Sequence, residues 1–210
     1  MGSIKGRFAP SPTGRMHLGN AFCALLAWLS ARSQGGRLLL RMEDLDPQRS
    51  RERYARMLME DLLWMGLDWD EGAGIPGEEE KQYWQSRREE EYAKALDLLK
   101  WQELLYPCFC TRAELHAAEA PHASDGQVIY SGRCRELTME ERQEKEKYRR
   151  PAIRIRVPDE MISFTDGCRG VYEENLAWDC GDFILRRSDG VFAYQLAVTW
   201  DDGVMGVSQV

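Results

Sequence analysis

The sequence lacks any apolar run long enough to cross a membrane. The longest run, residues 21–29, is about half of the ~18 to 20 residues that a membrane-spanning helix requires. The N-terminus also lacks the charged segment followed by an apolar segment that marks a secretory signal. We therefore expect a cytoplasmic protein with no membrane partner. Its six cysteines are then expected to be free thiols or metal ligands rather than a disulfide framework.

The chain also lacks an excess of positive charge. It contains 28 Lys and Arg against 35 Asp and Glu, which gives a formal net charge of -7. Any contact with nucleic acid must therefore depend on a local basic patch rather than on the overall field of the protein. A hydrophobic content of 43% over 210 residues is sufficient for a sizeable core. The composition indicates a globular protein and does not by itself suggest RNA.

The first half of the chain has the element order of an α/β nucleotide-binding fold. A strand is expected over Ile4–Ala9, a helix from about Leu18 to Gln34, and a second apolar strand over Arg37–Met42. Two parallel strands joined by a helix form a βαβ unit, which is half of a Rossmann-type fold. Helical spacing predicts two further packing helices, Arg51–Trp64 and Gln82–Lys100.

The second half of the chain has a different texture. A capping box over residues 138–141 predicts the start of a short charged helix. Alternating residues predict a strand over Ala152–Val157, and hairpin turns are expected at Asp166-Gly167 and at Ser188-Asp189-Gly190. This region is therefore expected to be rich in β structure.

The change of texture divides the chain into three parts. Residues 1–105 are interpreted as the first part of a Rossmann-type domain, residues 106–181 as an insertion, and residues 182–210 as the return to the first domain. In the last part, a short helix is expected over Tyr194–Asp202 and a strand over Val204–Val210.

The loop after the first strand has the properties of a phosphate site. Gly14 and Gly19 allow close approach of the backbone, and the helix beginning near Leu18 directs free N–H groups and a positive dipole end toward a ligand. His17 and Asn20 add hydrogen-bond donors at the same helix start. From the residues alone, His17 could equally be a helix-capping residue.

The string RFAPSPTG at Arg7–Gly14, followed by HLGN at His17–Asn20, resembles the signature of the glutamyl branch of class I aminoacyl-tRNA synthetases. HLGN corresponds to the HIGH motif that binds ATP, with Asn20 in place of its second histidine. Further matches are RMEDLD at Arg41–Asp46 and the segment Tyr194–Val210. The resemblance implies an α/β fold: a class I synthetase Rossmann-type parallel sheet with an inserted zinc-binding, β-containing subdomain that faces the tRNA acceptor.

The resemblance also implies which residues bind the two small substrates. The ATP-binding residues would be Thr13, His17, Gly19 and Asn20, with His17 and Asn20 assisting the chemistry. The glutamate-binding residues would be Arg7, Phe8, Ala9, Pro10, Ser11, Glu43 and Tyr194. Ser11 and Thr13 favour glutamate over glutamine, because the glutaminyl branch typically has PPEPNG at this place.

The chemistry of these residues agrees with the implied roles. Arg7 suits a carboxylate of the substrate, Glu43 suits its ammonium group, and the hydroxyls of Ser11 and Tyr194 can orient both. Without the family context, two other interpretations stay open. Arg7 could form a surface salt bridge, and Glu43 could be a helix-capping acid.

Three cysteines have a spacing compatible with one metal ion. Cys108 and Cys110 form a Cys-x-Cys pair, and Cys134 lies beyond a polar loop. The fourth ligand could be His116, His122 or Tyr130, and reduced core cysteines are the alternative to a metal site. Tyr130-Ser-Gly-Arg-Cys134 is similar to the closure of the zinc site in glutamyl-queuosine tRNA(Asp) synthetases. The resemblance therefore implies a structural zinc ion bound by Cys108, Cys110, Tyr130 and Cys134.

The resemblance implies a reaction in two steps. L-glutamate would be activated by ATP with Mg as glutamyl-adenylate, and the glutamyl group would pass to queuosine at the wobble position of tRNA(Asp). One alternative is the catalytic half of a glutamyl-tRNA synthetase that charges tRNA(Glu). Another is a non-catalytic RNA-binding module, because the 210 residues contain no KMSKS-like lysine loop. We expect this loop to lie beyond Val210 in a longer, monomeric protein.

Overall fold

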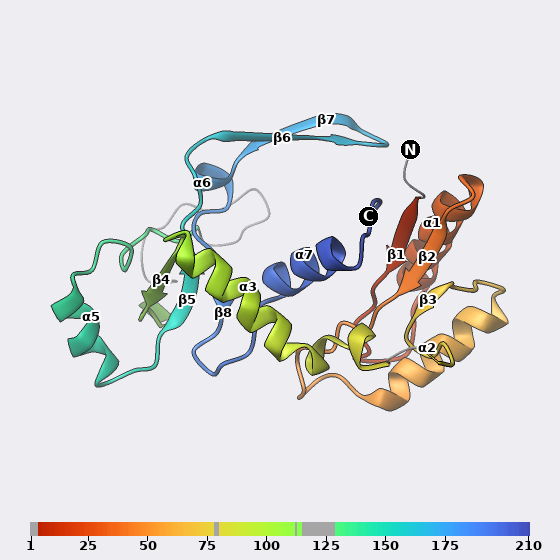
Figure 1. Ribbon diagram of the computed structural model, residues 1–210, viewed down its shortest axis with the longest axis horizontal. Helices are drawn as coiled ribbons and strands as arrows, with labels where there is room; N and C mark the ends of the chain where they lie inside the picture. Colours follow the sequence, from red (N-terminus) through yellow and green to blue (C-terminus); the bar gives the residue numbers. More distant parts are fainter. Residues whose placement is uncertain (1–3, 78–79, 112, 115–128) are drawn as a thin grey trace. The chain divides into compact units, whose positions relative to one another are not determined.

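The computed structural model describes residues 4–77, 80–111, 113–114 and 129–210 (Figure 1). The chain divides into two compact units. The first comprises residues 1–95 and 194–210, and the second comprises residues 96–193. The second unit includes more residues than the insertion expected over residues 106–181. The reason is that its sheet includes a strand that begins at Leu105 and another strand after residue 181.

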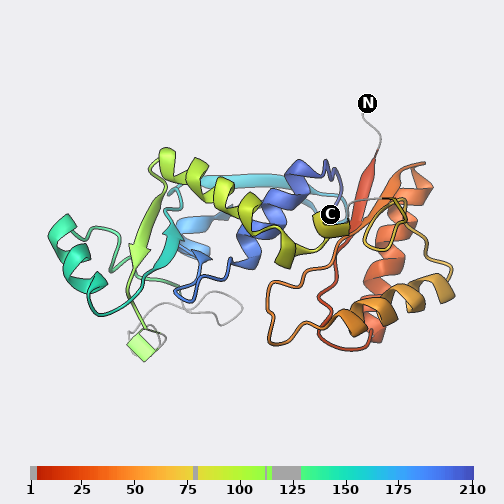
Figure 2. The same ribbon diagram turned by 60° about the horizontal axis from the view of Figure 1, so that its bottom comes forward.

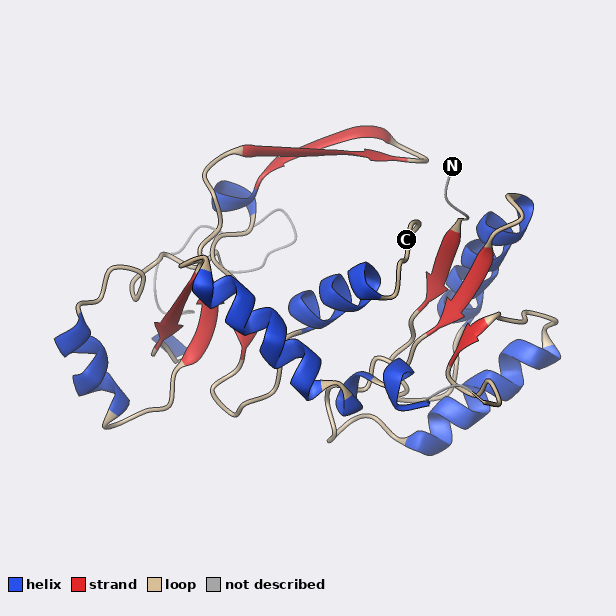
Figure 3. Cartoon of the chain, in the orientation of Figure 1, coloured by secondary structure: helices blue, strands red, loops and turns tan. Residues whose placement is uncertain are grey.

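The first unit is built on a parallel sheet of order β1-β2-β3. Its strands are β1 (Lys5–Phe8), β2 (Arg37–Leu40) and β3 (Glu71–Gly72), and α1 (Leu18–Ser33) connects the first two (Figure 3). The predicted parallel βαβ unit is confirmed. Gly36 permits a close approach at the end of α1, because an added Cβ would lie 2.7 Å from the carbonyl oxygen of Ile4.

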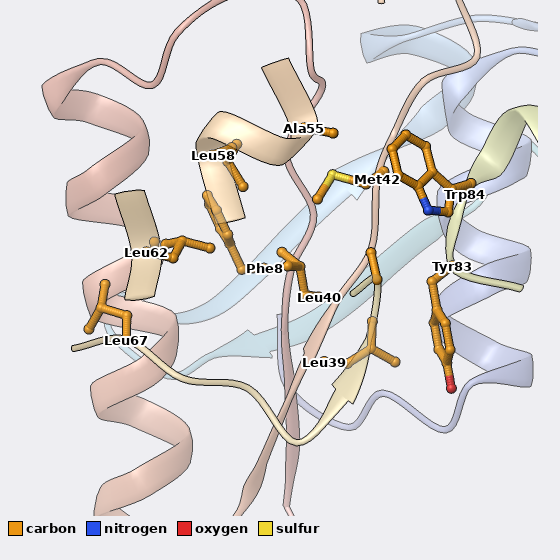
Figure 4. Packing of buried hydrophobic residues seen from close by; sticks show 12 residues of the cluster. Phe8, Leu39, Leu40, Met42, Ala55, Leu58, Leu62, Leu67, Tyr83 and Trp84 are labelled. Atoms are coloured by element: carbon orange, nitrogen blue, oxygen red, sulfur yellow. The ribbon is translucent and has the colours of Figure 1, made fainter. Parts of the chain in front are cut away.

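One face of this sheet carries the main apolar core. Phe8 and Leu40 pack with Leu58 and Leu62 of α2 (Glu52–Trp64), and Ala24 of α1 joins the same cluster (Figure 4). Burying a leucine or phenylalanine side chain stabilises a fold by about 1.5–3 kcal/mol. This packing fixes the carboxyl ends of β1 and β2, after which the motif residues follow.

The outer edge of β1 bonds to α7 (Tyr194–Val204) and to the residues that follow it. The Nζ of Lys5 donates to the carbonyl of Met205 at 2.8 Å. The predicted helix at 194–202 is confirmed and is two residues longer than expected. The predicted strand over Val204–Val210 is wrong. The chain turns at Gly206, where φ is +68°, and only Gln209 forms a bridge to β1.

The helix predicted over Gln82–Lys100 is confirmed only in its second part. α3 spans Glu89–Trp101, and two 3₁₀ segments, η1 (Glu80–Tyr83) and η2 (Gln85–Arg87), precede it. The backbone of Met42 explains the difference. Its N–H donates to the carbonyl of Tyr83 at 2.8 Å, and its carbonyl accepts from the N–H of Gln85 at 3.1 Å. These two groups are therefore not available to a continuous helix.

The second unit contains an antiparallel sheet of order β4-β5-β8 and a separate hairpin (Figure 2). The sheet consists of β4 (Leu105–Cys108), β5 (Ala152–Ile155) and β8 (Ile184–Arg186), and the hairpin of β6 (Met161–Asp166) and β7 (Gly170–Asn175). Both predicted turns are confirmed, since the chain reverses between β6 and β7 and again before the bridge from Arg186 to Phe192.

Two short helices of the second unit lie among the residues that the structure describes. α5 (Met139–Glu146) begins with the predicted capping box, in which Thr138 and Glu141 bond reciprocally. α6 (Leu176–Asp179) is capped by the side chain of Asn175. Across the described parts of both units, no helix is long and apolar enough to span a bilayer.

Candidate active site and metal centre

His17 caps the first helix. Its Nδ1 accepts hydrogen bonds from the backbone N–H groups of Gly19 at 3.1 Å and of Asn20 at 3.4 Å. The side-chain oxygen of Asn20 accepts in return from the N–H of His17 at 3.3 Å. Because Nδ1 is an acceptor, a neutral His17 carries its proton on Nε2. The capping interpretation is therefore correct, and it leaves a donor N–H on the exposed side of the ring.

Gly19 serves this cap directly. A Cβ at this position would lie 3.1 Å from Cε1 and 3.2 Å from Nδ1 of His17, which is tighter than ordinary van der Waals contact. Gly19 thus makes room for the imidazole at the helix start. By contrast, an added Cβ on Gly14 would meet no atom of the described chain within 4 Å.

Arg7, at the end of β1, forms an ion pair with Asp202 of α7. The Nε of Arg7 lies 3.2 Å from each carboxylate oxygen of Asp202. Among the described residues, none accepts a hydrogen bond from the two terminal nitrogens of Arg7. Arg7 is therefore held at one edge of its guanidinium and has two N–H₂ groups available for a bidentate contact.

Arg41 links Asp202 to Glu43. Its side chain is fully buried, with Nη1 2.8 Å from Asp202 and Nη2 3.3 Å from Glu43. Together with the Arg7 pair, these contacts form a continuous series of alternating charges from Arg7 to Glu43. The interpretation of Glu43 as a helix cap is wrong, because the next helix, α2, begins after Arg51 and has no side-chain cap.

Glu43 is held beside the first loop by its backbone. Its N–H donates to the carbonyl of Pro10 at 3.0 Å. Burial raises the pKa of Glu43, and the adjacent Arg41 offsets part of this rise. Burial, followed by the charge of Glu43, raises the pKa of Tyr194, so this phenol is neutral at pH 7. The structure thus brings Arg7, Glu43 and Tyr194 into one electrostatic neighbourhood.

The other predicted residues of the loop differ in whether their side chains are exposed and so able to contact a ligand. The side chain of Phe8 belongs to the apolar core, and Pro10 is buried. These two residues can contribute only backbone groups. Ser11 and Thr13 are exposed, and Ala9 is half-buried.

Asp201 is the centre of a second buried network. Its carboxylate accepts from the Nε of Arg88 at 2.8 Å, from Gln85 at 3.0 Å and from the hydroxyl of Tyr92 at 2.9 Å. Arg41 lies 3.7 Å away. The network ties α7 and the start of α3 to β2, which fixes Asp202 in place.

The three cysteines of the second unit meet as predicted. The Sγ atoms of Cys108, Cys110 and Cys134 lie within 4.8 Å of one another. The hydroxyl of Tyr130 lies 3.5 Å from Sγ of Cys108 and 3.8 Å from Sγ of Cys110. His116 and His122, the other suggested ligands, lie outside the described residues.

The distances fit a tetrahedral metal ion. With Zn–S bonds of about 2.3 Å and a Zn–O bond of about 2.0 Å, tetrahedral geometry separates the sulfurs by about 3.8 Å and sulfur from oxygen by about 3.5 Å. Cys110 and Cys134 are 3.7 Å apart, which is also too far for a disulfide. The backbone N–H of Phe109 donates to Sγ of Cys134 at 3.5 Å, and that of Cys134 to the Tyr130 hydroxyl at 2.8 Å.

The pKa values of the Cys108 and Cys110 thiols depend on burial and on nearby groups, which include the cation Arg154. Burial and the neighbouring thiol of Cys108 raise the pKa of Cys110 to about 12. Burial also raises the pKa of Cys108, but contacts with Tyr130 and Arg154 outweigh it, so the net pKa is lowered. Metal binding at this cluster would therefore release protons.

A family model described as tRNA synthetases class I (E and Q), catalytic domain, matches residues 3–210. The chain belongs to the class I tRNA synthetases. The expected α/β fold of that class, with its parallel sheet, is therefore confirmed, and the expected cysteine cluster accompanies it. The capped start of α1 is the His17–Asn20 segment whose sequence resembles the HIGH motif.

The curated relatives of this chain have names that belong to the glutamyl branch of the family. A glutamyl-Q tRNA(Asp) synthetase of Nitratidesulfovibrio vulgaris is 56% identical over 99% of this chain. A glutamate--tRNA ligase of Alkalilimnicola ehrlichii is 48% identical over 99% of this chain and matches along 44% of its own length. The predicted resemblance to glutamyl-queuosine synthetases is confirmed. The chain spans 64% of the length of the Nitratidesulfovibrio protein.

A solved structure supports the same family membership. The crystal structure of a glutamate tRNA ligase from Elizabethkingia meningosepticum, in complex with its amino acid, superimposes with a TM-score of 0.78. The two sequences are 32% identical, and the match covers 98% of this chain and 43% of the ligase. The fold is thus shared with synthetases whose names specify glutamate.

Reasoning from the sequence missed the residues that connect the predicted ones. Arg41 lies within RMEDLD, and Asp201 and Asp202 lie within the matching C-terminal segment, but none was singled out. A motif shows which residues recur together, whereas the bridge from Arg7 to Glu43 depends on β1, β2 and α7 meeting in space. Arg154, beside the cysteine cluster, carried no signal in the sequence.

Proposed function

We propose that the protein activates L-glutamate with ATP and transfers the glutamyl group to tRNA. The observation that carries this proposal is the series of charges Arg7, Asp202, Arg41 and Glu43. It places a cation with free N–H groups and a buried carboxylate in one site, as an amino acid with an additional carboxylate requires. Arg7 would bind a carboxylate, Glu43 the ammonium group, and Ser11 and Tyr194 would add hydrogen bonds.

The first step would be an attack on ATP by the α-carboxylate of glutamate. A carboxylate oxygen forms a bond to the α-phosphorus, the bond to the bridging oxygen breaks, and pyrophosphate leaves with Mg, giving glutamyl-adenylate. Nε2–H of His17 and the side-chain N–H₂ of Asn20 would stabilise the charge that develops on the phosphoryl oxygens. Thr13 and Gly19, with the start of α1, would complete the ATP site.

For the second step we favour queuosine in tRNA(Asp) as the acceptor. Support comes from the names of relatives at 56% and 51% identity and from the Tyr130 and Cys134 arrangement. In the transfer, an acceptor hydroxyl attacks the activated carbonyl carbon, and AMP leaves. A second candidate acceptor is tRNA(Glu), which is favoured by the relative named glutamate--tRNA ligase at 48% identity.

We further propose that Cys108, Cys110, Cys134 and Tyr130 hold a structural zinc ion. Zinc bound there would cross-link the end of β4 and the residues just after it to the loop that carries Cys134, and it would take no part in either chemical step. The unit that contains it would face the tRNA, as expected for residues 106–181.

A transfer assay with labelled glutamate tests the proposal. The native protein that contains this chain should label tRNA(Asp) carrying queuosine and leave unmodified tRNA(Asp) and tRNA(Glu) unlabelled. Labelling of tRNA(Glu) instead would establish the second candidate. Glutamate binding without labelling of any tRNA would support the non-catalytic module, and absence of glutamate binding would refute the proposed substrate.

A further inference from the structure

Arg154 of β5 is a buried cation beside the cysteine cluster of Cys108, Cys110 and Cys134. Only 5% of its surface is exposed. The guanidinium carbon lies 3.8 Å from the centre of the Tyr130 ring. One terminal nitrogen donates to the backbone carbonyl of Asp182 at 2.6 Å, and Nε has no hydrogen-bond partner.

Within the described residues, no carboxylate lies within ion-pair distance of Arg154. The carboxylate of Asp182, whose backbone carbonyl accepts from Arg154, is not directly paired with Arg154 and is bonded by other donors. It accepts from the hydroxyl of Tyr106 at 2.6 Å and from the N–H of Val157 at 2.9 Å, and Arg135 lies 3.6 Å away. A buried charge without a counter-ion is strongly unfavourable, because the lost hydration is not replaced.

The ring of Tyr130 alone does not resolve this imbalance. A cation over an aromatic face is attracted to the ring quadrupole, but the interaction leaves the net charge of the site unchanged. The thiols of the cluster lie at the hydroxyl end of the same ring, with Sγ of Cys108 3.5 Å from the Tyr130 hydroxyl, and Arg154 is among the groups that act on Cys108. A divalent ion held by three thiolates carries one net negative charge, and two if Tyr130 binds as phenolate.

We propose that the metal–thiolate centre is the counter-ion of Arg154, and that Arg154 is a positioning residue that neutralises this centre and holds the Tyr130 ring against it. The inference rests on the proposed zinc site. It predicts that the charge of Arg154 contributes more in the zinc-loaded state, in which the metal–thiolate centre carries net negative charge, than in the zinc-free state.

The test compares Arg154→Met, which keeps the length and removes the charge, with Arg154→Lys, which keeps the charge. Zinc affinity is measured by competition with a chromophoric chelator, and thermal unfolding is measured with and without zinc. We expect Arg154→Met to lower zinc affinity about tenfold or more and Arg154→Lys to lower it less. The loss of stability in Arg154→Met, relative to wild type, should be larger in the zinc-loaded form than in the zinc-free form.

Arg156 provides a matched control. Arg156 lies directly after β5, two residues beyond Arg154. Its guanidinium lies over the ring of Tyr106 at 5.1 Å and pairs with Glu136 at 3.1 Å. Arg156 has its own carboxylate partner and also donates to the backbone carbonyl of Arg135 at 2.7 Å, and none of its described contacts is with a cysteine. Arg156→Met should therefore change zinc affinity much less than Arg154→Met.

Two results would overturn the inference, and they are distinguishable. Equal zinc affinity of wild type and Arg154→Met, with the same loss of stability in both states, would show that Arg154 acts only through packing. A wild-type chain that binds no zinc would refute the metal site itself. If Arg154→Met does not fold, Arg154→Gln, which retains a donor for the Asp182 carbonyl, provides the same comparison.

Discussion

The Nε atom of Arg7 lies 3.2 Å from both carboxylate oxygens of Asp202, so one residue of β1 is oriented by one residue of α7. Asp202 also accepts from the buried Arg41 at 2.8 Å. It therefore pairs with two cations at once. Neither role was visible in the linear motif, and both concern the residue proposed to bind the substrate carboxylate.

Asp202→Asn should weaken glutamate binding. The variant keeps the size of the side chain but releases Arg7 from its fixed orientation, so we expect KM for glutamate to rise about tenfold, equivalent to ~1.4 kcal/mol, with little change in KM for ATP. Kinetics of the activation step would check this. Asp189→Asn, which removes the partner of exposed Arg187, is the matched control and should have no effect. Equal KM values for Asp202→Asn and wild type would contradict the positioning role.

His17 has two roles that substitution can separate. His17→Asn retains an N-cap oxygen for the first turn of α1 but removes the imidazole N–H. We expect its thermal stability to match wild type and its activation rate to fall about a hundredfold. His17→Ala should lose the rate and also about 1 kcal/mol of stability, because the cap is gone. An active His17→Asn protein would show that His17 is a structural cap only.

Acidification should weaken glutamate binding at a higher pH than an ordinary carboxyl would require. Burial raises the pKa of Glu43 above its usual 4.5, so Glu43 becomes protonated as pH falls through this raised value. The protonated acid no longer pairs with the substrate ammonium, and KM for glutamate should therefore rise on the acid side. KM profiles from roughly pH 5 to 8 would check this.

Glu43→Gln is the control for that profile. It should have a raised KM at neutral pH and should lose the acid-side dependence. The same linkage has the opposite sign for folding, because a carboxyl with a raised folded-state pKa favours the folded state at low pH and loses that contribution as pH rises through the raised pKa. A pH profile of Glu43→Gln that matches wild type would assign the dependence to another group.

Removal of zinc should destabilise the second unit. Few of its residues form an apolar core around the cysteines, so we expect a strong chelator to lower its thermal unfolding temperature and Cys134→Ser to lose stoichiometric metal. Tyr130→Phe should bind zinc more weakly, as measured by elemental analysis after dialysis. Cys180→Ser, at an exposed cysteine outside the cluster, should retain full metal content. Stoichiometric zinc in Tyr130→Phe would exclude Tyr130 as a ligand.

The sequence predicted the local elements better than the contacts between them. Apolar periodicity placed α1, α2 and β2 to within two residues at each end, because this signal is local. The helix expected from Gln82 failed, since the backbone of Met42, forty residues away, takes the hydrogen bonds that a helix would need. The strand expected after Val204 failed because Gly206 turns the chain.

The same distinction applies to the candidate sites. The cysteine spacing and the Tyr130 resemblance predicted a cluster that the structure brings together. Arg154 could not be predicted, because its importance depends on burial beside that cluster and not on any motif. Likewise, Arg7 and Glu43 were predicted singly, and only the fold reveals that Asp202 and Arg41 join them.

Pyrophosphate exchange tests the central claim most directly. The native protein that contains this chain, given ATP, Mg and L-glutamate without any tRNA, should transfer label from pyrophosphate into ATP. Glutamine in place of glutamate should give little or no exchange, because its amide cannot form the charged contact proposed for Arg7. Absence of glutamate-dependent exchange in a folded, zinc-loaded protein would contradict the proposal that this fold activates glutamate without RNA.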